Sequence, residues 1–307
     1  MTMTREKQFV FGVDAGGTSV RVALADEDGL VIAEARGTAQ ADGGPAALDG
    51  PSRQVVADVG QVRAVCAGIT KFSRAGVRAA WEADLAARFP RAASVEVVPD
   101  FVTAFVGATG GVGIAVIAGT GSVVYGENEW GGAARVGGRG WEYGDEGSGA
   151  HLTTEVVRRT LRALDGLGPA SDLTRVVCCH LGSDEAGDLA ERARRRAERE
   201  GRGFLVPLVL ERARAGDKEA TALFVGAGGW LASQVRASAV RLGFDTPDTP
   251  QFPIATVGGL WEAGDLLLQP FGLVLARWLP HAEVVPPRAS PVYGAVHRAA
   301  VAVVKRR

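Results

Sequence analysis

The sequence predicts an α/β fold made of two similar domains. The chain has 307 residues, which is enough for two domains that each bury a core. Residues 9–30 and 114–130 repeat one pattern, in which an apolar run reaches a turn of Gly, Thr and Ser and a second apolar run follows at once. Helical periodicity is frequent after each of these β-rich stretches. We therefore expect a sheet flanked by helices in each half of the chain.

The first third of the chain alternates strand and helix patterns. Apolar runs bounded by turn residues predict strands at 9–13, 19–25, 30–35, 64–69 and 94–100. Apolar residues at helical spacing predict helices at 53–59, 76–89 and 101–111. The fifth strand ends on Asp100, so this carboxylate should lie between the end of a strand and the start of a helix.

The strand pattern restarts at Ile114, passes through a turn into a second strand, and turns again at 126–130 before a Gly-rich loop that ends at Gly149. A strand, a pair of glycines and a helix are expected within 252–264. Helical spacing predicts further helices at 151–166, 184–200, 220–243 and 290–307. Arg and Glu alternate over 191–202 at i, i+3 and i+4, which favours a solvated helix face over a nucleic-acid patch.

Composition and charge narrow the function classes. The formal net charge is −1, so no nucleic-acid partner is expected. The polar N-terminus has no signal-peptide core, and no apolar run is long enough to predict a membrane span. Cys66, Cys178 and Cys179 lack the spacing of a disulfide framework or a zinc site. We expect these cysteines to be packing residues in a protein of the reducing cytoplasm.

Two Gly-rich turns, 16–19 ("GGTS") and 119–122 ("GTGS"), are candidate phosphate-binding elements. β-forming residues follow each turn, so each is a hairpin tip rather than the strand-to-helix turn of a Rossmann or P-loop site. Glycines at such a tip let backbone N–H groups line a concave nest for phosphate oxygens. The hydroxyls of Thr18, Thr120 and Ser122 can add donors. Two ordinary hairpins are the alternative interpretation.

The presence of two tips favours a binding role. If two similar domains pack across a cleft, each can present its tip to the same polyphosphate from opposite sides. Asp14 precedes the first tip and could hold Mg²⁺ through water, because carboxylate oxygens are hard ligands. The two tips therefore predict a clamp around one nucleotide.

Five motifs follow one another in order over nearly the whole chain: 14–24 ("DAGGTSVRVAL"), 117–126 ("IAGTGSVVYG"), 137–149 ("GGRGWEYGDEGSG"), 257–267 ("VGGLWEAGDLL") and 291–296 ("PVYGAV"). As an ordered set they resemble the actin/hexokinase/Hsp70 superfamily of ATP-dependent proteins. Within it, the chain is most similar to the branch of N-acetylglucosamine kinases and BadF/BadG-type ATPases.

This resemblance implies two ribonuclease-H-like (actin-like ATPase) domains with a cleft between them and helices flanking each sheet. The N-terminal lobe would comprise residues 1–111 and the closing helix 292–307, and the C-terminal lobe residues 112–291. The implied ligands of ATP are the tip residues and the adenosine-side glycines, namely Asp14, Gly16, Gly17, Thr18, Gly119, Thr120, Gly121, Ser122, Gly258 and Gly259. For the last two glycines, a strand-to-helix turn of the core is the alternative.

The resemblance also implies a catalytic base and a sugar site. Asp100 falls where these kinases keep the base, and a helix N-cap is an alternative role compatible with it. Asp145 resembles the carboxylate that binds sugar hydroxyls, with a turn-stabilising role as the alternative. The other implied sugar contacts are Gln40, Thr120, Gly138 and Arg139. Whether Glu146 and Ser148 take part in catalysis or brace the loop is left open.

Two departures from the family fall on sugar-contacting positions. Arg139 stands where a Trp commonly follows the paired glycines, with Trp141 two positions on, and Gln40 is the nearest candidate for an Asn expected after the third strand. Arg139 could meet the carboxylate of a muramic-type sugar or form a salt bridge to Glu142 or Glu146. We favour the salt bridge.

The predicted activity is ATP- and Mg²⁺-dependent phosphorylation of an amino sugar, with N-acetylglucosamine 6-phosphate as the favoured product and glucosamine or a muramic-type sugar as alternative substrates. An alternative of another class is a BadF-type ATPase that activates a partner reductase or dehydratase. Those relatives hold an iron–sulfur cluster between two subunits, which the three cysteines do not suit. A non-enzymatic sugar sensor would need a DNA-binding segment, for which there is no room before Phe9. A homodimer is compatible with the resemblance, but no motif sets the oligomeric state.

Overall fold

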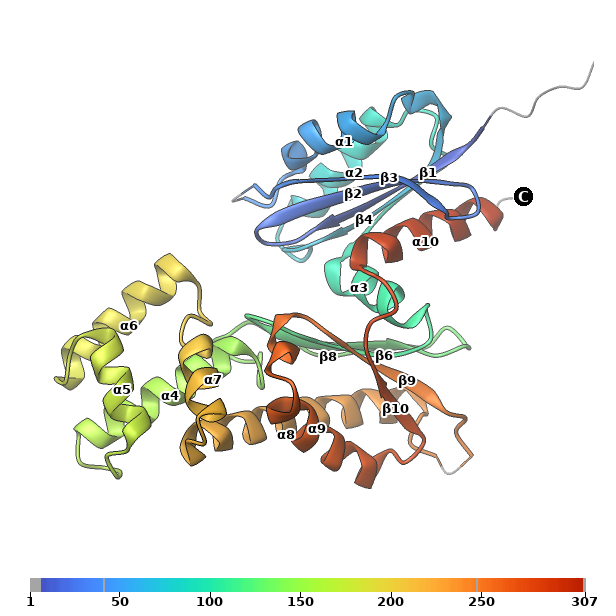
Figure 1. Cartoon of the computed structure of the whole chain (residues 1–307). Coiled ribbons are helices and arrows are strands. Elements are labelled where there is room, and N and C mark those ends of the chain that lie inside the picture. The colour runs from blue at the N-terminus through green and yellow to red at the C-terminus, as the bar shows by residue number, and fades with distance from the viewer. Residues whose placement is uncertain (1–6, 41, 247, 306–307) are drawn as a thin grey trace, which may run out of the picture. The chain divides into compact units, whose positions relative to one another are not determined.

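The computed structural model describes residues 7–40, 42–246 and 248–305 (Figure 1). The chain divides into unit 1, Met1–Val112 with Pro286–Arg307, and unit 2, Gly113–Val285. Residues 1–6 of the polar N-terminus and residues 306–307 of the expected closing helix lie outside the described residues. Within the described ranges, no helix combines the length and apolar character needed to cross a membrane.

Unit 1 is built on a five-stranded mixed sheet with the order β3-β2-β1-β4-β5. Its strands are β1 (Phe9–Ala15), β2 (Ser19–Asp26), β3 (Val31–Thr38), β4 (Val62–Ile69) and β5 (Ser94–Pro99). The first three strands form an antiparallel meander, and β4 and β5 run parallel to β1. The carboxyl ends of β1, β4 and β5 therefore lie at one edge of the sheet.

Helices cover both faces of this sheet (Figure 1). They are α1 (Asp49–Val55), α2 (Val77–Arg88), α3 (Asp100–Thr109) and α10 (Pro291–Val304). Side chains alternate between the two faces along β1. Phe11 and Val13 pack in one cluster with Trp81 of α2, whereas Val10 packs in another with Val296 of α10. This alternation decides which face of β1 each polar residue can reach.

Unit 2 repeats the topology of unit 1. Its strands are β6 (Gly113–Ala118), β7 (Ser122–Glu127), β8 (Ala133–Gly137), β9 (Phe252–Val257) and β10 (Ala282–Val285). They follow the order β10-β9-β6-β7-β8, with β6, β7 and β8 antiparallel and β9 and β10 parallel to β6. The hairpins β1–β2 and β6–β7 thus occupy equivalent places in their sheets.

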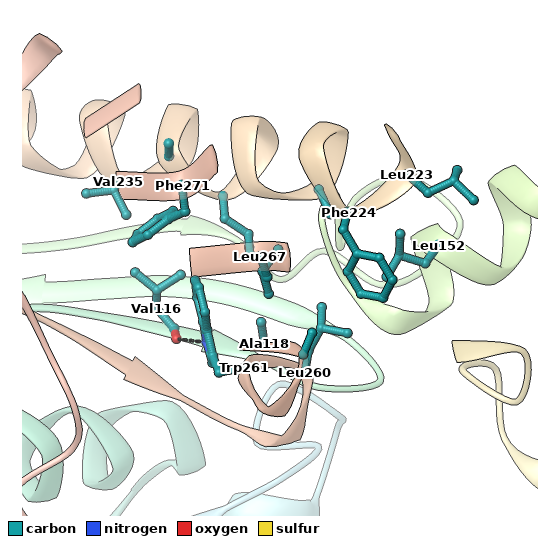
Figure 2. Packing of buried hydrophobic residues seen from close by; sticks show 14 of the residues in the cluster. Val116, Ala118, Leu152, Leu223, Phe224, Val235, Leu260, Trp261, Leu267 and Phe271 are labelled. Atoms are coloured by element: carbon teal, nitrogen blue, oxygen red, sulfur yellow. Dashed lines mark hydrogen bonds between the residues drawn. The ribbon is translucent and has the colours of Figure 1, made fainter. Parts of the chain in front are cut away.

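The helices of unit 2 are α4 (Gly149–Leu164), α5 (Asp172–Leu181), α6 (Ala186–Glu200), α7 (Val206–Arg214), α8 (Lys218–Leu242) and α9 (Asp265–Trp278). Helices α8 and α9 lie along one face of the sheet (Figure 1). Figure 2 shows Phe224 of α8 with Leu267 and Phe271 of α9 in the same apolar cluster as Val116 of β6. The indole Nε1 of Trp261 donates a hydrogen bond to the Val116 carbonyl at 3.2 Å, which ties the segment after β9 to β6.

The sequence located most of these elements to within a few residues. Two short strands, β8 and β10, were not predicted, and none of the predicted helix ranges covers α5, α7 or α9. The helix expected over 53–59 is instead α1, because it starts at Asp49 and ends before Val56, whose extended backbone leads toward β4. Strand β8 has only five residues and β10 only four, so neither shows a clear period.

Helices α3 and α10 approach each other so closely that glycine is required at the contact. A Cβ on Gly294 of α10 would lie 2.0 Å from the Thr103 carbonyl oxygen and 2.5 Å from the Gly107 nitrogen of α3. A Cβ on Gly107 would in turn lie 2.5 Å from the Ser290 carbonyl oxygen. Since backbone atoms cannot move away as side chains can, these glycines set the separation of the two helices.

We expect Gly294→Ala to destabilise the protein by about 3 kcal/mol or more, because the added methyl group forces α10 away from α3. Gly272→Ala in α9 is the matched control, since a Cβ there meets nothing within 4 Å. That variant should be stabilised by about 0.5–1 kcal/mol through higher helix propensity. Calorimetric unfolding of both variants checks this; equal stabilities would contradict the close contact.

Candidate active site

In unit 1, the carboxyl ends of the parallel strands bring Asp14 and Asp100 together. Asp14 is the penultimate residue of β1 and pairs in register with Gly68 of β4, which pairs with Val98 of β5. Asp100 follows two residues later as the first residue of α3. A side chain on Gly68 would collide with Thr103 of α3, so the glycine lets this helix pack over the end of the sheet.

The negative charge of Asp14 is disfavoured by its surroundings, which raises the pKa of this carboxyl. Burial raises its pKa, the negative charge of Asp100 raises it further, and Arg21 on β2 lowers it, with the result that the pKa of Asp14 is about 6. A carboxylate with so high a pKa lies in a place where its charge is poorly compensated by the protein itself. Such perturbed groups are typical of ligand and catalytic sites.

Asp100 sits at the first turn of α3. Pro99 occupies the N-cap position and makes no side-chain cap, so the N-cap role considered for Asp100 is not the one seen. Asp100 Oδ1 instead accepts a hydrogen bond from the Phe101 amide at 2.9 Å, and Thr103 Oγ1 donates to the Asp100 carbonyl. An acidic group at this end of a helix is favoured by the helix dipole.

The first hairpin tip, Gly16–Thr18, connects β1 to β2 and is closed by a hydrogen bond from the Gly16 amide to the Ser19 carbonyl. Gly17 and Thr18 are exposed. A Cβ added to Gly17 would meet no atom within 4 Å, so the protein itself gives no steric reason for glycine there. The surface at Gly17 is therefore open, with space beside the backbone that the protein itself does not fill.

The loop after β3 lies against this first tip. The Ala39 amide donates to the Thr18 carbonyl at 3.2 Å, and the Gly43 amide donates to the carbonyl of Gln40. Trp81 of α2 anchors the same loop through a 2.8 Å hydrogen bond to the Gly43 carbonyl. Gln40 is exposed, and Ala41 beside it lies outside the described residues.

The second hairpin tip, in unit 2, is bonded to the start of α4. The amides of Gly149 and Ala150 donate to the carbonyls of Gly119 and Thr120 at 2.8 and 3.0 Å. These helix N-terminal amides are therefore engaged by the protein, and α4 does not present them as a Rossmann helix would. The Thr120 side chain is exposed at the tip.

Ser122 and Gly121 meet the loop that carries Asp145. Ser122 Oγ donates to the Glu146 carbonyl at 2.9 Å, and its amide donates to the Asp145 carboxylate. A Cβ on Gly121 would lie 2.8 Å from an oxygen of the same carboxylate. The Ser122 hydroxyl was expected to donate to phosphate, but it donates its hydrogen bond within the protein. The space beside Gly121 is filled by Asp145.

Residues 137–149, which we call the GDEG loop, hold the other predicted sugar contacts. Asp145 has a positive φ of 58°, and burial raises the pKa of its carboxyl, although amides of Gly140 and Ser122 donate to it. Ser148 is fully buried and caps α4 by accepting the His151 amide, which supports a bracing role.

Arg139 lies exposed in this loop. The favoured salt bridge of Arg139 to Glu142 or Glu146 was a wrong prediction, since no such ion pair forms within the described ranges. Gly138, its neighbour, also has a positive φ, and its carbonyl accepts a hydrogen bond from Arg135. The guanidinium of Arg139 is therefore oriented by no carboxylate of its own loop.

Gly258 and Gly259, the two glycines expected to contact adenosine, lie next to the second tip. Gly258 follows β9, which pairs with β6, and a Cβ on Gly258 would lie 2.4 Å from the Ala118 carbonyl oxygen. Its φ is +104°, so the fold itself requires glycine there. Gly259 has no such constraint and is exposed. Gly258 therefore fits the interpretation as a turn of the core, whereas Gly259 leaves an open surface that a ligand could contact.

Comparison with known proteins agrees with this geometry. Residues 11–296 match the model of the BadF/BadG/BcrA/BcrD ATPase family. The chain belongs to this family. The family resemblance that the five motifs indicated is therefore confirmed.

Two curated relatives and one solved structure are similar to the chain. The N-acetyl-D-glucosamine kinase of Dictyostelium discoideum is 25% identical over 94% of this chain and 97% of its own length. The N-acetylmuramic acid/N-acetylglucosamine kinase of Clostridium acetobutylicum is 28% identical over 52% of this chain and 56% of its own. The crystal structure of a "Putative N-acetylglucosamine Kinase" from Chromobacterium violaceum is 29% identical, with a TM-score of 0.72 over 94% of this chain and 98% of that one. The predicted α/β fold with two actin-like sheets is confirmed.

Gln234 of α8 was not foreseen from the sequence. Its Nε2 donates to the Glu146 carbonyl at 3.0 Å, so it contacts the GDEG loop from a helix almost ninety residues further along the chain. The only signal was a polar residue among the apolar and small positions of 220–243, which is a weak one without the fold. Ser148 and Ser122, by contrast, lie inside motifs that the sequence analysis had selected.

The elevated pKa of Asp14 generates a stability prediction. A carboxyl whose pKa is raised in the folded state holds its proton longer than in the unfolded chain, so its ionisation lowers stability as pH rises from about 4 to 6. We expect Asp14→Asn to stabilise the ligand-free protein by about 1–3 kcal/mol at pH 8, and this advantage to vanish toward pH 4. Denaturant unfolding at several pH values measures it. Asp28→Asn, at an exposed turn, is the control substitution.

The contrast between Gly17 and Gly258 generates a second prediction. Gly17→Ala should leave the unfolding temperature unchanged but weaken binding of Mg–ATP about tenfold or more, because the methyl group occupies space that only a ligand would use. Gly258→Ala should instead destabilise the fold by about 2–3 kcal/mol. Calorimetric titration and thermal unfolding separate the two effects, and undiminished ATP affinity in Gly17→Ala would return the tip to an ordinary hairpin.

Proposed function

We propose that this chain is an ATP-dependent kinase of an amino sugar, with N-acetylglucosamine as the first candidate substrate and its 6-hydroxyl as the acceptor. The observation that carries this proposal is the pair Asp14 and Asp100 at the sheet edge that also ends in the first glycine tip. The full-length similarity to an N-acetyl-D-glucosamine kinase supports the substrate class.

Asp100 would act as general base. Its carboxylate would accept the proton of the substrate hydroxyl while that oxygen attacks the γ-phosphorus, and the bond from phosphorus to the bridging oxygen of ADP would break. The negative charge would then leave on ADP. A well-placed base contributes about 10²–10⁴ in rate, which is about 3–5 kcal/mol of the barrier.

The two tips would hold the phosphates through backbone amides and threonine hydroxyls. In phosphoryl transfer most of the catalysis is positioning and charge neutralisation, so amide donors around the phosphate oxygens are the main contribution expected of the protein. Gly16, Gly17 and Thr18 would act from unit 1, and Gly119 and Thr120 from unit 2. Gly258 and Gly259 would lie against the adenosine.

The residues of unit 1 fit a magnesium ion. Asp14 is a largely buried carboxylate whose charge is raised in energy by Asp100, and a divalent cation would relieve both. Mg²⁺ usually keeps several waters and takes one or two carboxylates together with substrate phosphates, which this pair can supply. Bound there with ATP, Mg²⁺ would neutralise charge on the phosphate oxygens. Asp14 would hold it through water.

The GDEG loop would bind the sugar. Asp145 can accept hydrogen bonds from sugar hydroxyls, since the Ser122 and Gly140 amides account for only part of the acceptor capacity of its two oxygens. Gly138, Arg139, Thr120 and Gln40 are the other proposed sugar contacts. Arg139 has no ion-pair partner among the described residues, which favours a muramic-type sugar as the second candidate substrate.

Substrate and base are tested together by measuring ADP release with N-acetylglucosamine, glucosamine, N-acetylmuramic acid and glucose. We expect an amino sugar to stimulate turnover, and Asp100→Asn to lose about 10²–10⁴ of kcat with nucleotide affinity retained. The matched control is Asp49→Asn, which alters another first-turn carboxylate of unit 1, one that pairs with Arg88.

Two results would contradict the proposal. Full activity of Asp100→Asn would remove Asp100 as the base. ATP hydrolysis that no sugar stimulates would favour the activating ATPase of another class, in which a partner protein receives the energy of hydrolysis. Cys66 offers little to that second function, because it is fully buried beside the Glu96–Arg298 ion pair.

A further inference from the structure

The Glu146 carbonyl joins three elements of unit 2. It accepts one hydrogen bond from Ser122 Oγ at the start of β7 and a second from Gln234 Nε2 in the middle of α8, at 2.9 and 3.0 Å. A carbonyl oxygen has two lone pairs, so both are used. The peptide after Asp145 is thereby held from the sheet on one side and from a helix on the other.

Contacts on either side of this peptide leave the loop little freedom. Asp145 has a left-handed backbone, with φ of 58°, which is uncommon for a non-glycine residue although Asp adopts it more readily than most. Gly147 has φ of 79°, and a Cβ there would lie 2.8 Å from the Ala227 carbonyl and 2.7 Å from Leu231, both on α8. The loop therefore rests directly on the helix that carries Gln234.

Gln234 is an unfavourable residue for stability alone. It is only 8% exposed, and its Oε1 has no hydrogen-bond partner among the described residues. This oxygen lies against Gly137, where a Cβ would be 2.4 Å away. A buried acceptor without a partner costs free energy that an apolar side chain of the same size would avoid. What the glutamine adds, and an apolar residue could not, is the hydrogen bond to Glu146.

We propose that Gln234 is a positioning residue that couples sugar binding to nucleotide binding. Through the Glu146 carbonyl it holds the Asp145 carboxylate in register with the second hairpin tip. The inference rests on the proposed function, because it assigns the sugar to Asp145 and the phosphates to the tip. It adds a residue that touches neither ligand.

The coupling has a physical route. Ser122 gives its amide to the Asp145 carboxylate and its hydroxyl to the Glu146 carbonyl, and Gly121 beside it is in close contact with Asp145. A phosphate that orders the tip therefore orders the carboxylate, and a sugar that fixes the carboxylate orders the tip. Linkage requires the two effects to be equal. Gln234 makes this possible by preventing the loop from moving away from the tip.

The test compares Gln234→Met with Ser238→Ala. Methionine keeps the length of the side chain and removes the donor, while Ser238 is a fully buried residue one turn further along α8 whose hydroxyl also lacks a partner. The factor by which saturating Mg–AMPPNP tightens binding of N-acetylglucosamine is measured by titration, together with kcat/KM and the unfolding temperature.

For Gln234→Met we expect the coupling factor to fall toward 1 and kcat/KM to fall about tenfold, which is about 1.4 kcal/mol. The unfolding temperature should stay the same or rise, because an unpaired acceptor is removed. Ser238→Ala should keep wild-type coupling. Loss of activity with retained or increased stability is a result that a merely structural role would not give.

Wild-type coupling in Gln234→Met would overturn the inference, and so would parallel loss of stability and activity in both variants. If the wild-type protein phosphorylates no amino sugar, the proposed function fails separately. The interlock is then judged by hydrogen exchange of residues 138–148 with and without Mg–AMPPNP. Protection in the wild type that disappears in Gln234→Met supports it, and equal protection in both proteins refutes it.

Discussion

Parallel pairing next to each hairpin decides where the functional residues of this chain meet. In unit 1, β4 and β5 run parallel to β1, so the end of β1, the first tip and the start of α3 all reach the same sheet edge. In unit 2, β9 runs parallel to β6 and brings Gly258 beside the second tip. An antiparallel partner would have placed a strand start there, and the residues following it would lie at the opposite edge. The approach of Asp14 to Asp100 and of Gly258 to Ala118 depends on this choice of strand direction.

The same edge carries an energetic cost. Asp14 shares a face of β1 with Val10 and Gly12, which pack beneath α10, and it must keep its charge close to Asp100. In the absence of ligand that charge destabilises the fold, which is the opposite of what a structural carboxylate does. Stability given up at one position is common where a protein binds a charged partner. Under the proposed function, a cation bound together with a triphosphate would compensate the charge of Asp14, and this compensation would add to the affinity for the ligand.

Much of the fold could be read from the chain because local pattern and tertiary structure agree. The strands at 9–15 and 113–118 are apolar runs that stop at glycine, and the long helices have clear periods. Strands β8 and β10 escaped because a strand of four or five residues has too few positions to show alternation. Both strands are nevertheless implied by the repeat. They lie in unit 2, where they complete the strand order that unit 1 already has.

The motifs of the candidate site could be predicted from the sequence, but the hydrogen bonds that connect them could not. Asp14, Asp100 and Asp145 could be selected as candidates from the sequence because each stands beside a recognisable turn. From the same motifs, Gly121 and Ser122 were expected to bind phosphate. In the structure, Gly121 lies close to the Asp145 carboxylate, and the Ser122 hydroxyl donates to the Glu146 carbonyl. Residue type alone cannot distinguish a glycine that admits a ligand from one that admits a neighbouring side chain. Only the position of the GDEG loop, which places Asp145 against Gly121, separates the two cases.

The two hairpins therefore have equal places in the topology and different tasks. The first tip has room at Gly17, and although the Gly16 amide donates to the Ser19 carbonyl, the amides of Gly17 and Thr18 have no main-chain acceptor among the described residues. The second tip is bonded through its carbonyls to α4 and through Ser122 to the GDEG loop, so a change of conformation at the tip is transmitted to that loop. A duplicated sheet makes such a division possible, because one copy can keep the open turn while the other incorporates its turn into a substrate loop. The exposed Arg139 lies on the GDEG loop. Under the proposed function, a change of this side chain would alter the choice of sugar while leaving the first tip unchanged.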